Sequence, residues 1–131
     1  MSGENVELVR TVLEDWARGD FRAGSDLFAP DFEWKQRSDA VEPGSHRGAS
    51  VGTALRQLFE VWENYRIEAD EFIDAGDRIV VVGRARGTAR ASGLELDQSL
   101  FLLWTARKGK LASLEVFRDR GEALEAVGLR Q

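Results

Sequence analysis

The sequence of 131 residues contains no cysteine, one histidine and two prolines. Without cysteine the chain cannot form disulfides, thiolate metal sites or a cysteine nucleophile, and this composition suits the reducing cytoplasm, where we expect the protein. The single histidine, His46, has no Cys/His cluster around it, which argues against a structural zinc site. We therefore predict no metal and no cofactor.

Long apolar runs are also missing. The longest are the size of a strand, far below the roughly 20 residues of a membrane span, so we expect no membrane contact. The start, Met1 to Asn5, is polar and acidic, which is unlike a signal peptide. The net charge is -5, and acids and bases are interspersed, so we expect no nucleic-acid partner.

The chain does contain a continuous block of strand signals from Tyr65 to Arg118. Three glycine-containing turns, at 75–77, 91–93 and 107–109, separate runs rich in Val, Ile, Leu and aromatic residues. We predict four consecutive antiparallel strands. The alternation slips between Ala69 and Phe72, which indicates a β-bulge near Asp70.

The residues before this block predict helices and one more strand. Val9, Val12, Leu13 and Trp16 form a helical stripe within residues 4–18. A short helix over 21–28, a strand over 32–36, a polar loop over 37–47 and a helix over 49–63 follow. A last helix is expected after Asp119, since 119–122 has capping-box spacing.

Side-chain alternation assigns the two faces of the predicted sheet. The small residues Gly83, Ala85, Gly87 and Ala89 share one face, and we interpret them as the wall of a cavity beneath the helix aromatics. A hairpin tip facing solvent is the alternative. The expected cavity lining is Trp16, Trp34, Phe59, Trp62, Gly83, Ala85, Ser99, Phe101, Leu114 and Val116.

The opposite face is also apolar and needs a cover, which a second copy of the chain supplies most simply. We therefore predict a homodimer. The residues expected on that interface are Arg84, Arg86, Leu100, Leu102, Trp104, Glu115 and Phe117, with Glu115 paired to the arginines.

The element order and several local motifs resemble the NTF2-like superfamily, in its SnoaL-like and ketosteroid-isomerase-like branch. The motifs are Gly19-Asp20, Leu27-Phe28-Ala29-Pro30-Asp31, His46-Arg47-Gly48, Leu94-Glu95-Leu96-Asp97, Gly109-Lys110-Leu111 and the tail 122–129. The resemblance covers essentially the whole chain as one domain, 1–131. It implies an α+β cone, with N-terminal helices packed on a strongly curved, mostly antiparallel sheet that encloses a pocket, and dimerisation through the outer sheet face.

The chemistries of that branch find little support in this sequence. The base, acid and tyrosine of a ketosteroid isomerase match Gln36, Phe101 and Val12, none of which can perform the role. The two carboxylates and the arginine of a limonene-type epoxide hydrolase match Ala85, Val116 and Gly83. An inward carboxylate of a SnoaL-type cyclase has no clear match.

Three polar residues remain as weak catalytic candidates. An imidazole in general titrates near neutrality, so His46 could act as a base at the pocket mouth, or it could be a surface histidine. Asp97 and Arg118 could orient a ligand oxygen, or they could be solvated strand ends. Trp16, Trp34, Phe59, Trp62 and Tyr65 could clamp a flat ligand, or they could be ordinary core.

Two functions remain open. The first is a domain that binds a small apolar organic molecule, with isomerase, cyclase or hydrolase chemistry as an extension. The second is a non-catalytic ligand-binding or dimerisation module, which the missing catalytic carboxylates favour.

Overall fold

The computed structural model describes residues 2–21, 25–36, 44–47 and 49–129, and for residues 2, 25, 36, 44–47, 49 and 50 it describes the backbone. The elements in chain order are α1 (Ser2–Ala17), η1 (Ser25–Leu27), β1 (Phe28–Gln36), β2 (Gly44–Arg47), α2 (Ala49–Val61), β3 (Trp62–Ala75), β4 (Arg78–Ala89), β5 (Glu95–Arg107), β6 (Lys110–Phe117) and α3 (Arg120–Ala126). No helix among these residues is long and apolar enough to cross a membrane.

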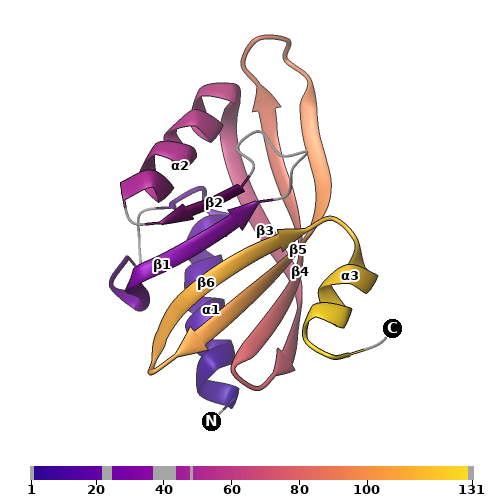
Figure 1. Cartoon of the computed structure of the whole chain (residues 1–131). Helices are drawn as coiled ribbons and strands as arrows, with labels where there is room; N and C mark the ends of the chain where they lie inside the picture. The colour runs from indigo at the N-terminus through magenta and orange to yellow at the C-terminus, as the bar shows by residue number, and fades with distance from the viewer. Residues whose placement is uncertain (1, 22–24, 37–43, 48, 130–131) are drawn as a thin grey trace.

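The described strands form one mixed sheet in the order β2-β1-β6-β5-β4-β3. Consecutive strands from β3 to β6 pair antiparallel, as the sequence predicts, and β1 pairs parallel to β6. The three turns lie where their glycines predict, with positive φ at Gly76, Gly93 and Gly109. The fold is therefore the predicted α+β cone, with a bent, mostly antiparallel sheet and helices on it (Figure 1).

Two of the predicted segments differ in the structure. Residues 44–47, expected in a loop, form β2 against β1, with Trp34 opposite His46. Phe28, expected at the end of a short helix, begins β1 and pairs with Leu111. For β2 the cause is its place at the edge of the sheet, where a short polar segment can pair without a strand pattern of its own.

Helix α1 covers one face of the sheet, which we call the inner face. Val9, Val12, Leu13 and Trp16 are buried and belong to one cluster with residues of β1, β3, β4, β5 and β6. Burying side chains of this size contributes about 1.5–3 kcal/mol each. In Figure 1 this helix passes behind the strands.

The opposite, outer face is partly covered by helix α3. Val80, Leu103, Phe117 and Ala123 are buried in a second, smaller cluster there. Asp119 caps α3, since its side chain accepts a hydrogen bond from the backbone N–H of Gly121. Part of the second cover that the sheet needs therefore comes from the chain itself.

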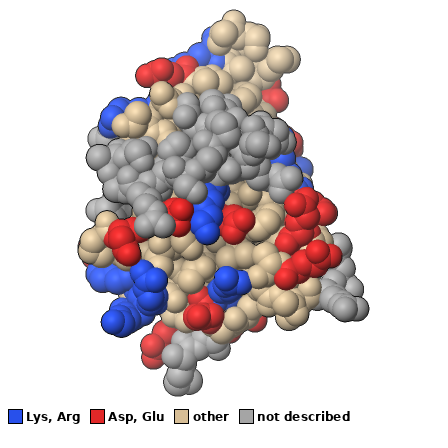
Figure 2. Space-filling model, viewed as in Figure 1, with Lys and Arg blue, Asp and Glu red and all other residues tan. Residues whose placement is uncertain are grey.

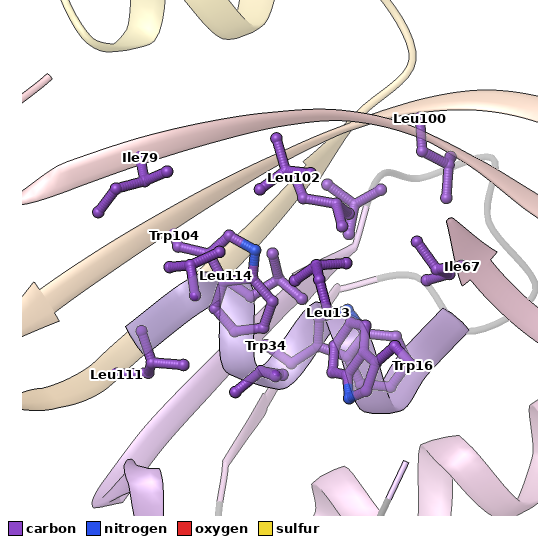
Figure 3. Packing of buried hydrophobic residues seen from close by; sticks show 14 of the residues in the cluster. Leu13, Trp16, Trp34, Ile67, Ile79, Leu100, Leu102, Trp104, Leu111 and Leu114 are labelled. Atoms are coloured by element: carbon purple, nitrogen blue, oxygen red, sulfur yellow. The ribbon is translucent and has the colours of Figure 1, made fainter. Parts of the chain in front are cut away.

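The predicted faces of β5 are wrong. Leu100, Leu102 and Trp104, expected on the dimer interface, are buried in the cluster with α1, and Figure 3 shows Leu102 and Trp104 directed towards Leu13. Ser99 is exposed and Phe101 packs in the outer cluster, so neither lines the inner face. Because the middle of β5 is apolar on both sides, alternation alone could not choose its buried face.

The row of small residues on β4 does not form the wall of a cavity; its glycines allow the backbone of β3 to pack closely against β4. An added Cβ at Gly83 would lie 2.6 Å from the carbonyl oxygen of Glu68, and one at Gly87 would lie 3.2 Å from that of Glu63. The backbone of β3 therefore fills the space that the sequence analysis assigned to a cavity. Ala85, between the glycines, is buried in the main cluster.

Candidate functional site

An open pocket lies where α1 and α2 end and β3 begins. It has a volume of about 450 Å³ and is lined by Arg18, Gly19, Phe59, Trp62, Asn64, Tyr65, Arg66 and Arg90. In Figure 1 this is the region where α2 passes into β3, at the end of the sheet from which the β4–β5 hairpin extends. The volume falls within the range of small-molecule sites.

A bulge at the start of β3 shapes the floor of this pocket. The β3–β4 register shifts between Glu63 and Arg66, and Asn64 has a φ of 56°. Asparagine tolerates this left-handed conformation better than most residues. The bulge lets Tyr65 face the helices while Arg66 lies at the sheet edge. A second bulge, between Ala69 and Glu71, confirms the slip predicted near Asp70.

Gly19 brings the end of α1 onto β3. It adopts a φ of 82°, its N–H donates to the carbonyl of Trp16, and an added Cβ would lie 3.3 Å from the carbonyl oxygen of Tyr65. The positive φ and the close approach both favour glycine here. This contact holds one wall of the pocket against the strand that forms its floor.

Aromatic rings form the apolar side of the pocket. Phe21 contacts both Phe59 and Tyr65, with ring centroids 5.5 and 5.7 Å apart, and it also packs on Trp16 at 5.0 Å. Trp16 in turn contacts Trp104 at 5.3 Å. The pocket wall is thus the outer end of an aromatic chain that continues into the core. Burial raises the pKa of Tyr65 to about 12, so its phenol stays protonated at neutral pH.

Two indole N–H groups deeper in this chain have no hydrogen-bond partner among the described residues. They belong to Trp16 and Trp104, whose side chains are 8% and 0% exposed. A buried donor without an acceptor lowers stability, because it has lost its water without replacement. Each indole N–H would donate a hydrogen bond to a water molecule or a ligand oxygen that came within reach.

Cationic side chains form the polar side of the pocket. Arg90 donates from Nε to the carbonyl of Phe59 over 2.9 Å, and its backbone N–H donates to the carbonyl of Val61 over 3.0 Å. Arg66 donates from Nη1 to the carbonyl of Asn64 over 3.3 Å. The backbone thus holds two guanidinium groups at the rim, and Arg90 also satisfies carbonyls at the end of α2.

The residues predicted to line a cavity fall into two groups: some line the open pocket, and the others lie elsewhere in the fold. Phe59 and Trp62 line the open pocket. Trp16, Trp34, Ala85, Leu114 and Val116 are buried in the main cluster. Ser99, Phe101 and Gly83 are not in the lining of this pocket. Sequence analysis missed Arg18, Gly19, Asn64, Arg66 and Arg90 as pocket residues.

Of the three catalytic candidates, Asp97 and Arg118 are absent from the lining of this pocket. Asp97 lies on the outer face, where the Arg84 guanidinium donates from Nε over 2.8 Å and holds the pKa of the carboxyl below its usual value. Arg118 is exposed beyond the end of β6. The side chains of His46 and Gln36 lie outside the described residues. No group of three His, Asp or Glu side chains suited to a metal occurs in the described part of the chain.

The outer face carries ion pairs that differ from those predicted. Arg84 pairs with Asp97, and Arg86 Nε lies 2.7 Å from Glu68 Oε1, so these arginines have partners other than Glu115. Figure 2 shows Lys and Arg interspersed with Asp and Glu over the visible face, with uncharged residues between them. Such mixed charge does not resemble a polyanion-binding surface.

Comparison with known proteins gives consistent similarities. The sequence profile of the SnoaL-like domain matches residues 9–114. An NTF2-like protein from Burkholderia thailandensis E264 is 30% identical, with a TM-score of 0.79 over 88% of this chain and 90% of that one.

Two further structures are similar over nearly the full length. An NTF2-like protein of unknown function from Burkholderia pseudomallei K96243 is 26% identical, with a TM-score of 0.78 over 95% of this chain and 98% of that one. TerC, co-crystallised with polyporic acid, is 25% identical, with a TM-score of 0.77 over the same shares. No curated protein matches the sequence.

Proposed function

The chain belongs to the SnoaL-like domain family, and we propose that it binds a small, largely apolar organic molecule in the pocket between the ends of α1 and α2 and the start of β3. The observation that carries the proposal is the opening of about 450 Å³ with Phe59, Trp62 and Tyr65 along it. Aromatic walls with a few polar groups are typical of small-molecule sites. The co-crystallisation of TerC with polyporic acid supports this ligand class.

The described lining favours binding over acid–base catalysis. Arginine stays protonated throughout the accessible pH range, and the phenol of Tyr65 loses its proton only near pH 12. Asn64 and the aromatic rings exchange no proton. The described lining can therefore hold and orient a ligand, but it supplies no group that accepts a proton near neutral pH.

The proposal is tested with a neutral fluorescent probe, N-phenyl-1-naphthylamine. We expect saturable binding with enhanced emission, and stabilisation of the fold that rises with probe concentration. Phe59→Ala removes part of the aromatic wall and should weaken binding about tenfold or more. Leu94→Ala is the matched control, since Leu94 is 70% exposed outside the pocket lining.

The outcome decides between this site and others. If the probe does not bind, or if Phe59→Ala binds as well as the Leu94→Ala control, the pocket is not the ligand site. Circular dichroism of both variants separates a lost site from a lost fold.

A further inference from the structure

The charge of the pocket lining narrows the chemical class of the ligand, and this inference rests on the function proposed above. Three of the eight described lining residues are arginines: Arg18 at the end of α1, Arg66 on β3 and Arg90 after β4. None of the eight is acidic. A site with this lining favours a negatively charged group on its ligand.

The carboxylates near these arginines leave much of each guanidinium available. Arg90 Nη1 lies 3.7 Å from Glu63 Oε2, and Arg66 Nε lies 3.5 Å from Glu68 Oε2. Both are long contacts between half-exposed side chains, which bind weakly. Arg18, directly after α1, pairs more closely with Asp15 of that helix. A guanidinium has five N–H donors, so each pair occupies only part of its donor set.

Two of the guanidinium groups are also fixed in position before any ligand arrives. Arg90 is held by the carbonyl of Phe59, and Arg66 by the carbonyl of Asn64. The first of these bonds has a second effect. The carbonyl end of a helix repels anions, and Arg90 offsets that partial negative charge at the end of α2. Donors held in place cost less entropy when they bind a ligand.

We propose that the natural ligand is an organic anion. Its flat apolar body lies against Phe59, Trp62 and Tyr65, and its carboxylate, or an oxyanion of similar geometry, accepts hydrogen bonds from Arg66 and Arg90. Arg18 adds positive charge from the end of α1. The protonated phenol of Tyr65 and the amide of Asn64 are further donors in the same lining.

The test compares two probes of the same shape, 2-naphthoate and 2-naphthamide. They share the ring system and differ in charge, so the ratio of their dissociation constants isolates the contribution of the arginines. We expect 2-naphthoate to bind at least about tenfold more tightly at low salt, with the ratio falling as salt screens the charges. Calorimetric titration of the full chain measures both constants.

Substitutions then show which arginines cause the preference for 2-naphthoate over 2-naphthamide. Arg66→Gln and Arg90→Gln should each weaken 2-naphthoate binding about tenfold while changing 2-naphthamide binding little. Arg107→Gln is the control, because Arg107 is also an exposed arginine with a carboxylate partner, Asp31, and is absent from the lining. Arg18→Gln is a further variant that leaves the bond between Arg90 and Phe59 intact.

The results distinguish failure of the anion assignment from failure of the proposed ligand-binding function. Equal binding of the two probes, or an unchanged ratio in all three pocket variants, would overturn the anion assignment and leave the pocket itself supported. Failure of both naphthyl probes and of N-phenyl-1-naphthylamine would overturn the proposed function, and the anion assignment with it.

Discussion

Arg84 and Asp97 form an ion pair across β4 and β5 on the outer face of the sheet, with Arg84 Nε 2.8 Å from Asp97 Oδ1. Arg84 lies opposite Ser99 in the register, so the pair runs diagonally between the strands. Such diagonal neighbours are within reach of long side chains. Asp97 is thus on the face opposite to Leu100 and α1, and it is not in the lining of the pocket.

Asp97→Asn should therefore leave binding of N-phenyl-1-naphthylamine unchanged within about twofold. The pKa of Asp97 is lowered when folded, so the stability it adds is present above the unfolded pKa and is lost as the pH falls below it. The free energies of unfolding of the wild type and the variant should thus differ most near neutral pH and become equal in acid. A large loss of probe binding would instead return Asp97 to the ligand site.

Gly83→Ala should destabilise the fold by about 1–3 kcal/mol, because the added methyl group meets the backbone of β3 at Glu68. Gly52→Ala in α2 is the control. Its added Cβ has only Arg56 Nη1 nearby, at 3.7 Å, and alanine favours a helix over glycine by up to about 1 kcal/mol. Urea unfolding of both variants measures the two effects, which should have opposite signs. Tolerance of Gly83→Ala would restore the cavity interpretation.

Trp104→Ala should cost about 3–5 kcal/mol, since this fully buried ring is in contact with Trp16, Phe28 and Phe32. Trp104→Phe should cost clearly less, because it keeps an aromatic ring and removes an indole N–H that has no partner among the described residues. Chemical denaturation of both variants provides the comparison. Equal losses would mean that the N–H has an acceptor in the native protein.

The raised pKa of Tyr65 predicts a loss of stability in strong alkali. The folded value is about 12 and the usual value is 10.0, so the protonated phenol stabilises the fold fully below pH 10 and this contribution disappears as the pH rises towards 12. Two pKa units correspond to at most about 3 kcal/mol. The free energy of unfolding of Tyr65→Phe should depend less on pH between 10 and 12 than that of the wild type. Parallel curves would contradict the burial of this phenol.

The uncovered part of the outer face leads us to propose a homodimer. Helix α3 covers Val80, Leu103 and Phe117, while Val82 and Arg84 are only partly buried. Sedimentation should give a dimer at micromolar concentration, and Val82→Asp should shift it towards monomer. Val61→Asp, on the exposed side of α2, should not. A wild type that sediments as a monomer would refute the proposal.

The sequence determined the order of the helices and strands apart from β2, and it placed the turns that join β3, β4, β5 and β6. Glycines with positive φ mark the three hairpin turns, the stripe from Val9 to Trp16 marks the buried side of α1, and the slip near Asp70 marks a bulge. These signals are local. Each depends on residues a few positions apart, whose spacing is fixed by the geometry of a helix, a strand or a turn.

Only the tertiary structure decided which face of β5 is buried and where the pocket opens. The middle of β5 is apolar on both sides, so its orientation followed from the pairing of Gly83 with Leu100 rather than from alternation. Arg18, Arg66 and Arg90 are far apart along the chain, and no local pattern shows that they share an opening. They meet because α1, the bulged start of β3 and the end of β4 converge, which is a property of packing between distant segments.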